Sequence, residues 1–172
     1  MQGRNSIRHV IFLDGPIGVG KTTFGQYLAQ EFAGDFIDGD DYAEAKLPWF
    51  ASSLSTSRHI LREILNALAS KNIVFVAYPI RCINWIYFER HLSALNINPV
   101  LLGLQAHRES IADVSRNRRL SETELTRSRE MTVQGYGSRE FSNLFVQADA
   151  GNLHEVVQNA KAALREELIK LS

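Results

Sequence analysis

The stretch IFLDGPIGVGKTTFGQYL, which runs from Ile11 to Leu28, decides the fold. Its first part is an apolar run that ends in glycine, which is typical of a buried strand. Its last part carries apolar residues at the spacing of an amphipathic helix, and that spacing continues to Phe32. Between the two, the residues from Gly15 to Thr22 match the pattern G-x-x-x-x-G-K-[ST] of a phosphate-binding loop. A glycine-rich turn without a ligand is the alternative, but the strand before the pattern and the helix after it favour phosphate binding.

Each residue type in this loop has a chemical reason to be there. Glycines let successive N–H groups turn toward a phosphate oxygen without a side-chain clash. The helix that begins at the loop adds unpaired N–H groups and the positive end of its dipole. Lys21 is predicted to reach the β- and γ-phosphates, and Thr22 to offer its hydroxyl to Mg²⁺. The predicted ATP-binding residues are therefore Gly15, Pro16, Ile17, Gly18, Val19, Gly20, Lys21, Thr22 and Thr23.

A dinucleotide-binding turn is the main rival interpretation of the same glycines. That turn requires the order G-x-G-x-x-G, whereas Gly15, Gly18 and Gly20 follow the order G-x-x-G-x-G. An acidic residue does follow at the expected distance, at Asp38. Lys21 with its neighbouring threonine still favours a nucleoside triphosphate over a dinucleotide.

The rest of the chain alternates strands with helices. Further strands are predicted in residues 35–41, 72–80, 98–106 and 141–150, and helical spacing is clearest in residues 60–68, 82–95 and 153–171. Pro48 is expected to break any helix in residues 42–56. Because the strands are continuous apolar runs, they suit a parallel sheet covered on both faces. We therefore predict an α/β fold whose ligands bind at the carboxyl ends of the strands.

Composition narrows the class of protein further. The length of 172 residues suits one domain over residues 1–172, and 19 basic and 19 acidic residues cancel. Neither a nucleic-acid partner nor a membrane partner is therefore expected, and no apolar run approaches the ~20 residues of a membrane helix. The single cysteine, Cys82, cannot form an internal disulfide and is expected to be a buried or half-buried thiol. These features favour a cytoplasmic monomer or homodimer that acts on a small molecule.

Two carboxylates, Asp38 and Asp40, follow the second predicted strand in the sequence FIDGDD. In an extended chain, residues two apart point the same way, so both carboxylates are expected to face the phosphate loop. One could orient Mg²⁺ or its water, and the other could take a proton from a substrate hydroxyl. An acidic turn held by its own side-chain hydrogen bonds is the alternative.

GPIGVGKT followed by FIDGDD resembles the small P-loop kinases of the shikimate kinase and gluconate kinase group. The resemblance implies a three-layer P-loop NTPase fold with strand order 2-3-1-4-5, with ATP and Mg²⁺ as cofactors. It also implies that Asp38 assists Mg²⁺ together with Thr22, and that Asp38 and Asp40 contact the substrate. The chain departs from the group after the third strand, where it carries AYPIR in place of the glycine triplet of shikimate kinases. No carboxylate ends that strand, and the acidic-Arg pair that deoxynucleoside kinases carry there is also absent.

Arginines crowd the segment before the last strand, approximately residues 108–137. By resemblance this segment is a lid whose closure excludes water, and Arg116 or Arg119 of the lid reaches the phosphates. A solvated helix whose arginines pair with glutamates and aspartates is the alternative. By the same resemblance, Arg58 and Arg81 hold a carboxylate or phosphate of the substrate. The alternative is that each is a surface residue, with Arg58 at a helix start. The predicted catalytic residues are thus Lys21, Asp40, Arg116 and Arg119.

The sequence therefore favours an ATP-dependent kinase that phosphorylates a hydroxyl of a small polar metabolite. A nucleoside or nucleotide kinase is one alternative, because Tyr42, Trp49 and Phe50 could form a slot for a base. An ATP-binding module without catalysis is the other, because the third strand lacks a carboxylate.

Overall fold

The central strand of the computed structural model is β1 (Arg8–Asp14), which the opening sequence motif predicts. The structure describes residues 7–43, 49–112 and 119–171, except for the side chains of residues 49–52. Every residue from His9 to Asp14 is buried, as a strand needs when helices cover both faces of its sheet. The other strands are β2 (Asp35–Asp38), β3 (Ile73–Ala77), β4 (Ile97–Gln105) and β5 (Leu144–Gln147).

The strands form one parallel sheet in the order β2-β3-β1-β4-β5, which confirms the predicted order. In its register, β1 places Leu13 opposite Ala77 of β3 and opposite Leu102 of β4. The carboxyl ends of β1, β2 and β3 consequently meet at one edge of the sheet, since Asp38 of β2 also pairs with Ala77. The phosphate loop follows β1 at that edge.

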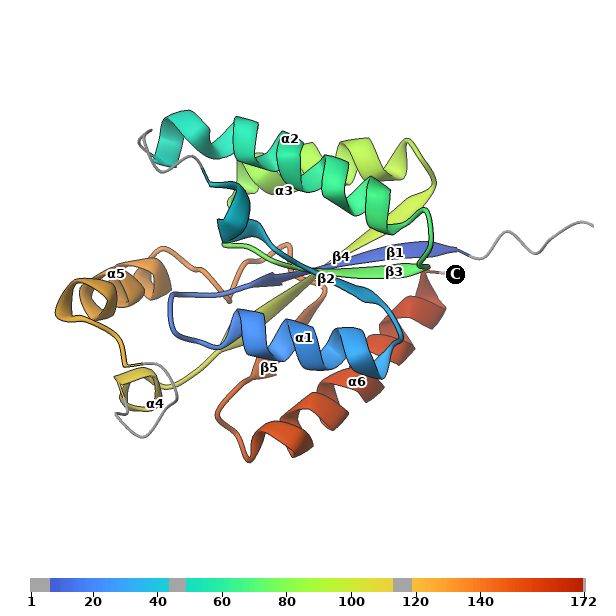
Figure 1. The fold of residues 1–172 in the computed structure, drawn as a ribbon. Helices are drawn as coiled ribbons and strands as arrows, with labels where there is room; N and C mark the ends of the chain where they lie inside the picture. Colours follow the sequence, from blue (N-terminus) through green and yellow to red (C-terminus); the bar gives the residue numbers. More distant parts are fainter. Residues whose placement is uncertain (1–6, 44–48, 113–118, 172) are drawn as a thin grey trace, which may run out of the picture.

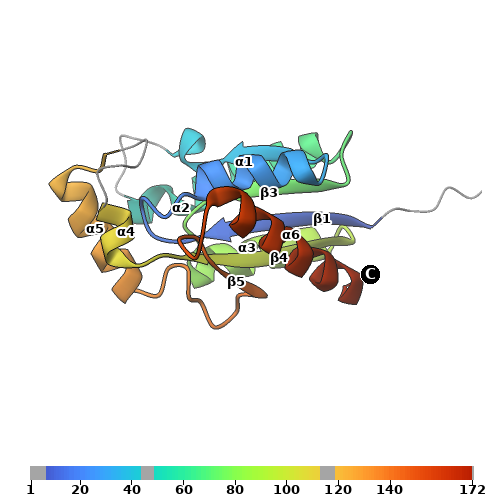
Figure 2. The same ribbon diagram turned by 90° about the horizontal axis from the view of Figure 1, so that it is seen from below.

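Two layers of helices cover the sheet, as Figures 1 and 2 show. On one face, α2 (Trp49–Ala67) and α3 (Cys82–Ser93) pack on a core that includes Phe12, which stacks 4.6 Å from Phe88 between ring centroids. On the other face, α1 (Lys21–Glu31) and α6 (Leu153–Lys170) cover a second core centred on Ile11 and Phe75. The three-layer architecture is therefore as predicted.

Two shorter helices, α4 (Arg108–Ala112) and α5 (Glu122–Val133), lie beyond the carboxyl ends of the strands in Figure 1. Ser121 begins α5 as an N-cap, accepting from the N–H of Glu124, whose side chain in turn accepts from the N–H of Ser121. This reciprocal capping explains why the helix begins there. The arginine-rich segment thus contains two helices that overhang the ligand-binding edge.

The boundaries differ from the prediction chiefly in α2. The apolar spacing indicates a helix from Ile60, whereas the structure begins the helix at Trp49, directly after Pro48. The first half of the helix lacks apolar spacing because its buried face carries polar residues, namely Ser53, Thr56 and Ser57. Tertiary hydrogen bonding therefore overrides the hydrophobic pattern here.

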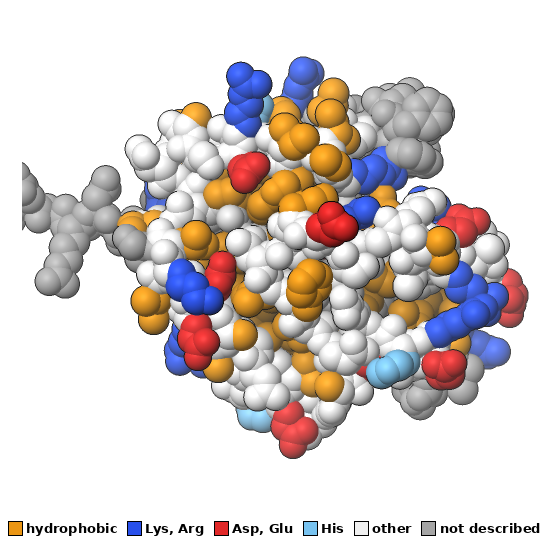
Figure 3. Space-filling model, turned by 180° about the vertical axis from the view of Figure 1, so that it is seen from behind, with side chains coloured by type: hydrophobic (Ala, Val, Ile, Leu, Met, Phe, Trp, Pro, Cys, Tyr) orange, Lys and Arg blue, Asp and Glu red, His pale blue; other side chains and the backbone are white. Residues whose placement is uncertain are grey.

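Charge is not segregated on the face of the molecule that Figure 3 draws. On the face drawn in Figure 3, acidic and basic side chains are interspersed, in keeping with the balanced composition. Among the residues that the structure describes, no helix combines the length and apolar character needed to cross a membrane.

Candidate active site

The phosphate loop has the backbone shape that its glycines predict. Gly18 and Gly20 have φ angles of 82° and 100°, in the left-handed region that favours glycine, and Gly20 is the N-cap of α1. The Lys21 Nζ atom donates to the carbonyls of Gly15 at 2.9 Å and Pro16 at 3.0 Å, so its charge lies over the loop. The loop therefore presents a positive charge at a helix N-terminus, where phosphate oxygens bind well.

A hydrogen bond joins the start of α1 to the end of β2. Thr22 Oγ1, in the first turn of α1, donates at 2.8 Å to Oδ2 of Asp38, the last residue of β2. The side chain of Thr22 is exposed and that of Asp38 is half-buried. A hydroxyl oxygen and a carboxylate oxygen are thus placed together beside the phosphate loop.

The backbone around Asp40 follows the turn that was the alternative interpretation of FIDGDD. An extended chain was expected through Asp40, but the backbone turns after Asp38 into a 3₁₀ helix, η1 (Gly39–Tyr42). The cause is the Asp38 side chain itself, whose Oδ1 accepts from the N–H of Asp40 at 3.2 Å and caps the turn. Asp40 is exposed and close enough to Tyr78 to act on its titration. The turn therefore caps itself, as the alternative interpretation of FIDGDD expects, and Asp38 lies at the phosphate loop through its contact with Thr22. The roles of Asp38 and Asp40 toward Mg²⁺ and the substrate stay predictions.

The overhanging helices rest directly on the phosphate loop. Ser128 Oγ of α5 donates to the carbonyl of Ile17 at 2.7 Å. A methyl group at Gly18 would lie 2.5 Å from Leu120 Cδ1 and 3.1 Å from Ile111 Cγ2, so the glycine allows this close approach. An apolar groove of about 220 Å³ separates α4 from α5. The segment is placed as a lid would be, and its lid function stays a prediction.

The predicted lid arginines have different positions. Arg116 lies outside the described residues, and Arg119 is exposed. Arg127 pairs with Glu130 at 2.9 Å on the surface of α5, as expected for a solvated helix. The structure therefore leaves the choice of a phosphate-binding arginine as a prediction.

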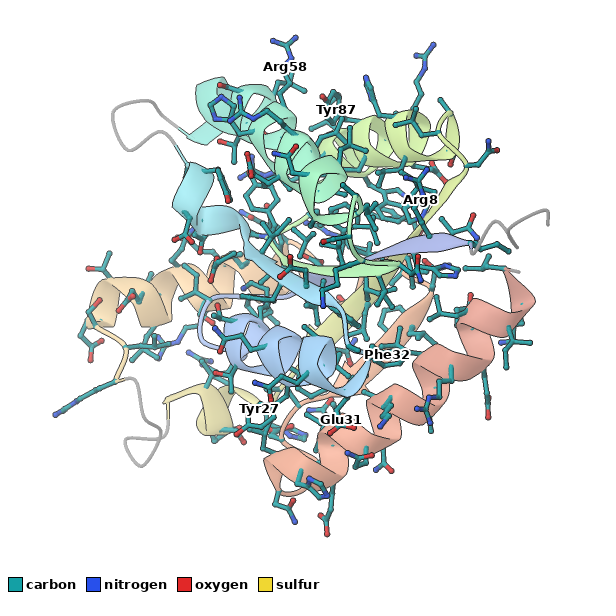
Figure 4. All side chains as sticks on the ribbon, turned by 45° about the vertical axis from the view of Figure 1, so that its right-hand side comes forward. Arg8, Tyr27, Glu31, Phe32, Arg58 and Tyr87 are labelled. Carbon is teal, nitrogen blue, oxygen red and sulfur yellow. The ribbon has the colours of Figure 1, made fainter. Side chains whose placement is uncertain are left out.

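The two predicted substrate arginines separate clearly. Arg81 is half-buried, and its Nε donates to the Tyr136 hydroxyl at 2.7 Å, so it faces the segment after α5. Arg58 is exposed, and Figure 4 shows it projecting from α2 away from the sheet. The structure thus brings Arg81 to the ligand-binding edge and does not bring Arg58 there. Cys82, expected to be buried or half-buried, is exposed because it begins α3 on the outer side.

Asp14 is a site residue that sequence reasoning missed. It ends β1, is 0% exposed, and accepts from Ile80 N and Gly137 N at 2.8 Å each. Arg139 lies 3.7 Å away, donates to the carbonyl of Ile80 and packs its guanidinium over the Tyr136 ring. Burial raises the pKa of Asp14, while the two N–H donors and the charge of Arg139 oppose that rise.

This Asp14 node ties the base of the phosphate loop to the loop after β3 and to the segment after α5. The local signal was present, because a carboxylate that ends a fully apolar strand must find partners. Its partners lie 66 and 123 residues further along the chain, so the local pattern does not indicate which residues they are.

A second missed cluster surrounds Asp149, just after β5. His107 donates to its carboxylate through the backbone N–H at 2.8 Å and contacts it through Nδ1 at 3.0 Å, and Gln147 donates at 2.6 Å. Burial alone would raise the pKa of Asp149, but hydrogen bonds from Ser110, Gln147 and His107 hold it well below its usual range. The cluster fastens the start of α4 to the β5–α6 loop.

The fold and the site together define the class of protein. A five-stranded parallel sheet in this order, with a glycine-rich loop, a lysine and a threonine between its central strand and α1, is a P-loop nucleoside triphosphate-binding fold of the small-kinase type.

Comparisons with known proteins agree with that class. The family model for shikimate kinase matches residues 17–76. The shikimate kinase of Acinetobacter baumannii (strain AYE) is 36% identical over 73 residues, which are 39% of this chain and 41% of the relative. The match therefore spans less than half the length of that relative.

Solved structures extend the likeness over the whole chain. A gluconokinase from Sinorhizobium meliloti 1021 has a TM-score of 0.69 at 18% identity, with coverage of 97% of this chain and 98% of the other. A shikimate kinase from Acinetobacter baumannii in complex with shikimate has a TM-score of 0.59 at 19% identity, with coverage of 94% and 95%. At these identities the likeness establishes the fold. The predicted resemblance to the shikimate and gluconate kinase group is confirmed at that level.

Proposed function

We propose that this protein is an ATP- and Mg²⁺-dependent kinase that phosphorylates a hydroxyl group of a small metabolite bearing an anionic group. The observation that carries the proposal is the contact between Thr22 and Asp38 at 2.8 Å, directly beside Lys21 and the loop amides. A glycine turn with only a structural role has no need of a hydroxyl and a carboxylate placed together at the helix N-terminus. A phosphotransferase needs both.

The residues present fit the two implied cofactors. Mg²⁺ in such sites takes one or two protein oxygens and completes its coordination with phosphates and water. Thr22 and Asp38 supply such oxygens, and within the described ranges no group of three or more His, Cys, Asp or Glu side chains could hold a metal alone. The left-handed Gly18 and Gly20 fit the phosphate chain of ATP. When bound, Mg²⁺ would neutralise charge on the phosphates.

Each protein group then has a distinct task. Lys21, now held on two loop carbonyls, exchanges them for phosphate oxygens and balances the charge that builds up during transfer. Asp40 would orient the acceptor hydroxyl and take its proton as the hydroxyl oxygen bonds to the γ-phosphorus. The bond from that phosphorus to the β–γ bridging oxygen would break, and ADP would leave. Arg81 binds the anionic group of the acceptor and thereby aims the hydroxyl. Positioning contributes most of the catalysis in such a reaction.

The test compares neighbouring carboxylates. Asp40→Asn is expected to lower phosphoryl transfer about a hundredfold to a thousandfold, because the base is lost. Asp41→Asn is the matched control, since Asp41 is also exposed and belongs to the same turn. Transfer is measured by mass spectrometry of a metabolite pool incubated with Mg²⁺, ATP and each variant.

The outcomes separate the three functional hypotheses. New phosphorylated hydroxy acids that vanish with Asp40→Asn support the proposal. Phosphorylated nucleosides would instead identify a nucleoside kinase. If calorimetry shows Mg²⁺–ATP binding but no pool yields a product, the protein is a binding module and the proposal is wrong.

A further inference from the structure

One serine of α5 forms a hydrogen bond that differs from the usual pattern inside helices. Ser128 is 3% exposed, and its Oγ donates at 2.7 Å to the carbonyl of Ile17, which lies 111 residues earlier in the chain. A serine or threonine inside a helix commonly donates to the carbonyl four residues before it. Thr132 of α5 and Ser57 of α2 do so, at 3.0 Å and 2.9 Å. The contact from Ser128 to the phosphate loop therefore needs an explanation.

The segment that holds α4 and α5 contacts both residues of one peptide unit, the unit between Ile17 and Gly18. Ser128 holds the carbonyl on the Ile17 side. On the Gly18 side, an added methyl group would lie 2.5 Å from Leu120 Cδ1 and 3.1 Å from Ile111 Cγ2, so both side chains lie against the glycine. The orientation of this peptide unit is consequently set by contacts from outside the loop.

The geometry of a peptide bond then fixes where the Gly18 N–H points. The carbonyl and the N–H of one planar trans peptide unit point in opposite directions. Figures 1 and 2 both show the phosphate loop between α5 and α1. Because the Ile17 carbonyl points toward α5, the Gly18 N–H points toward the N-terminus of α1. Phosphate is expected on that side, and loop N–H groups are the donors that a P-loop offers to it.

We infer that Ser128 is a positioning residue that keeps the Gly18 N–H directed at the phosphates of ATP. Without the serine hydroxyl, the peptide unit can rotate and the N–H spends part of its time turned away. Gly18 does not oppose this rotation, because glycine adopts positive and negative φ angles about equally well. The inference rests on the proposed function only in that the loop binds Mg²⁺–ATP, and it does not require phosphoryl transfer.

The experiment measures Mg²⁺–ATP binding by calorimetry for the wild type, Ser128→Ala and Thr132→Val. Thr132→Val is the matched control, because it removes a hydroxyl of the same helix whose acceptor, the carbonyl of Ser128, lies within α5. Ser128→Cys nearly keeps the shape of serine but donates only weakly, so it repeats the test should alanine disturb the helix. Urea denaturation of every variant checks that the fold is intact.

The Gly18 amide proton gives a second readout, which reports on the loop itself. In an isotope-labelled sample, its NMR signal moves downfield when the N–H donates to a phosphate oxygen, because the hydrogen bond draws electron density away from the proton. Spectra at saturating Mg²⁺–ATP therefore distinguish a turned N–H from a general weakening of the site by a displaced helix.

We expect Ser128→Ala and Ser128→Cys to bind Mg²⁺–ATP about tenfold more weakly than the wild type, which is near the lower end for one hydrogen bond to a charged group. In both variants, the Gly18 proton should lose most of the downfield shift that ATP causes in the wild type. Thr132→Val should match the wild type in both measurements.

The inference is overturned if a folded Ser128→Ala or Ser128→Cys binds with wild-type affinity, or binds weakly but keeps the full downfield shift of the Gly18 proton. It is also overturned if Thr132→Val weakens binding equally. If the wild type does not bind Mg²⁺–ATP, the proposed function and the inference fail together. If the wild type binds it but transfers no phosphoryl group, the proposed function alone fails.

Discussion

Two strands of this sheet end in aspartate, and the two carboxylates have opposite surroundings. Asp14 at the end of β1 is fully buried, with both oxygens committed to backbone N–H groups and Arg139 close by. Asp38 at the end of β2 is half-exposed, with one oxygen on the Thr22 hydroxyl and the other on the N–H of Asp40. The same residue type at the same edge thus has two environments.

The difference shows how burial divides structural from chemical roles. A fully buried carboxylate whose oxygens accept from fixed backbone N–H groups holds the backbone and is closed to solvent and to a ligand. A carboxylate bonded to a hydroxyl that can rotate is able to exchange that partner for a metal ion or its water. We therefore expect substitutions at Asp38 to change activity, and substitutions at Asp14 to change stability first.

The largest effect is expected from Asp38→Asn. Loss of the charge beside Thr22 should lower kcat/KM for Mg²⁺–ATP by about a thousandfold, similar to the removal of other charge-stabilising groups from active sites. The free energy of unfolding should change by less than about 1 kcal/mol, because the amide oxygen can still cap the turn. Steady-state kinetics and urea denaturation of the same samples measure both quantities. A large loss of stability with normal kinetics would reverse the roles that we assign.

Asp14→Asn should have the next largest effect, now on stability. The amide can accept only one of the two N–H groups and leaves Arg139 beside a neutral side chain, so we expect a loss of about 3 kcal/mol. A lower midpoint of urea denaturation with an unchanged slope measures it.

The double variant Asp14→Asn with Arg139→Gln is the control for this prediction. It should lose less than the sum of the two single variants, because the buried charge is then removed together with its partner. Wild-type stability in Asp14→Asn would show that the Asp14 node does not hold the loops together.

The contrast between these carboxylates also shows what a sequence can predict. The phosphate loop and the two helix layers follow from local patterns, since the loop and the apolar strands each report their own environment. The sheet order, in contrast, was implied by the resemblance to the shikimate and gluconate kinase group. Asp38 could be assigned to the site because it follows a strand and lies within a short motif. The η1 turn was one of two alternatives for FIDGDD, and the sequence could not decide between them, because the outcome depends on the Asp38 side chain accepting one particular N–H.

The Asp14 node shows where prediction from sequence stops. Its partners Ile80, Gly137 and Arg139 have no local pattern that marks them, since contacts far apart in the chain are set by the folded backbone. The same applies to Tyr78, whose sequence position after a strand says nothing about the ring that covers Gly39. The sequence therefore predicts which residues carry the chemistry of the site, but it does not predict the distant residues that hold them in place.

A third carboxylate, Asp149, gives the smallest and most specific prediction. Like Asp14, it accepts several hydrogen bonds, here from His107, Gln147 and Ser110. Its pKa is lowered, however, whereas the pKa of Asp14 is raised. A carboxyl group with a lowered pKa in the folded state stabilises the fold fully above its unfolded pKa of about 4. That stability is lost as the pH falls through the lower, folded pKa.

Asp149→Asn should therefore cost about 1 to 2 kcal/mol of unfolding free energy at pH 6, and the gap to the wild type should narrow steadily below pH 4. Urea denaturation at pH 6, 5, 4 and 3 measures the gap. Asp35→Asn is the control, because Asp35 is exposed and its carboxylate accepts only from the adjacent N–H of Phe36 among the described groups. A gap that stays constant down to pH 3 would mean that the hydrogen bonds to Asp149 do not discriminate between its charged and neutral forms. A full set of hydrogen-bond donors would then mark a carboxylate as structural, rather than as one that binds a ligand, only where the carboxylate is fully buried, as Asp14 is.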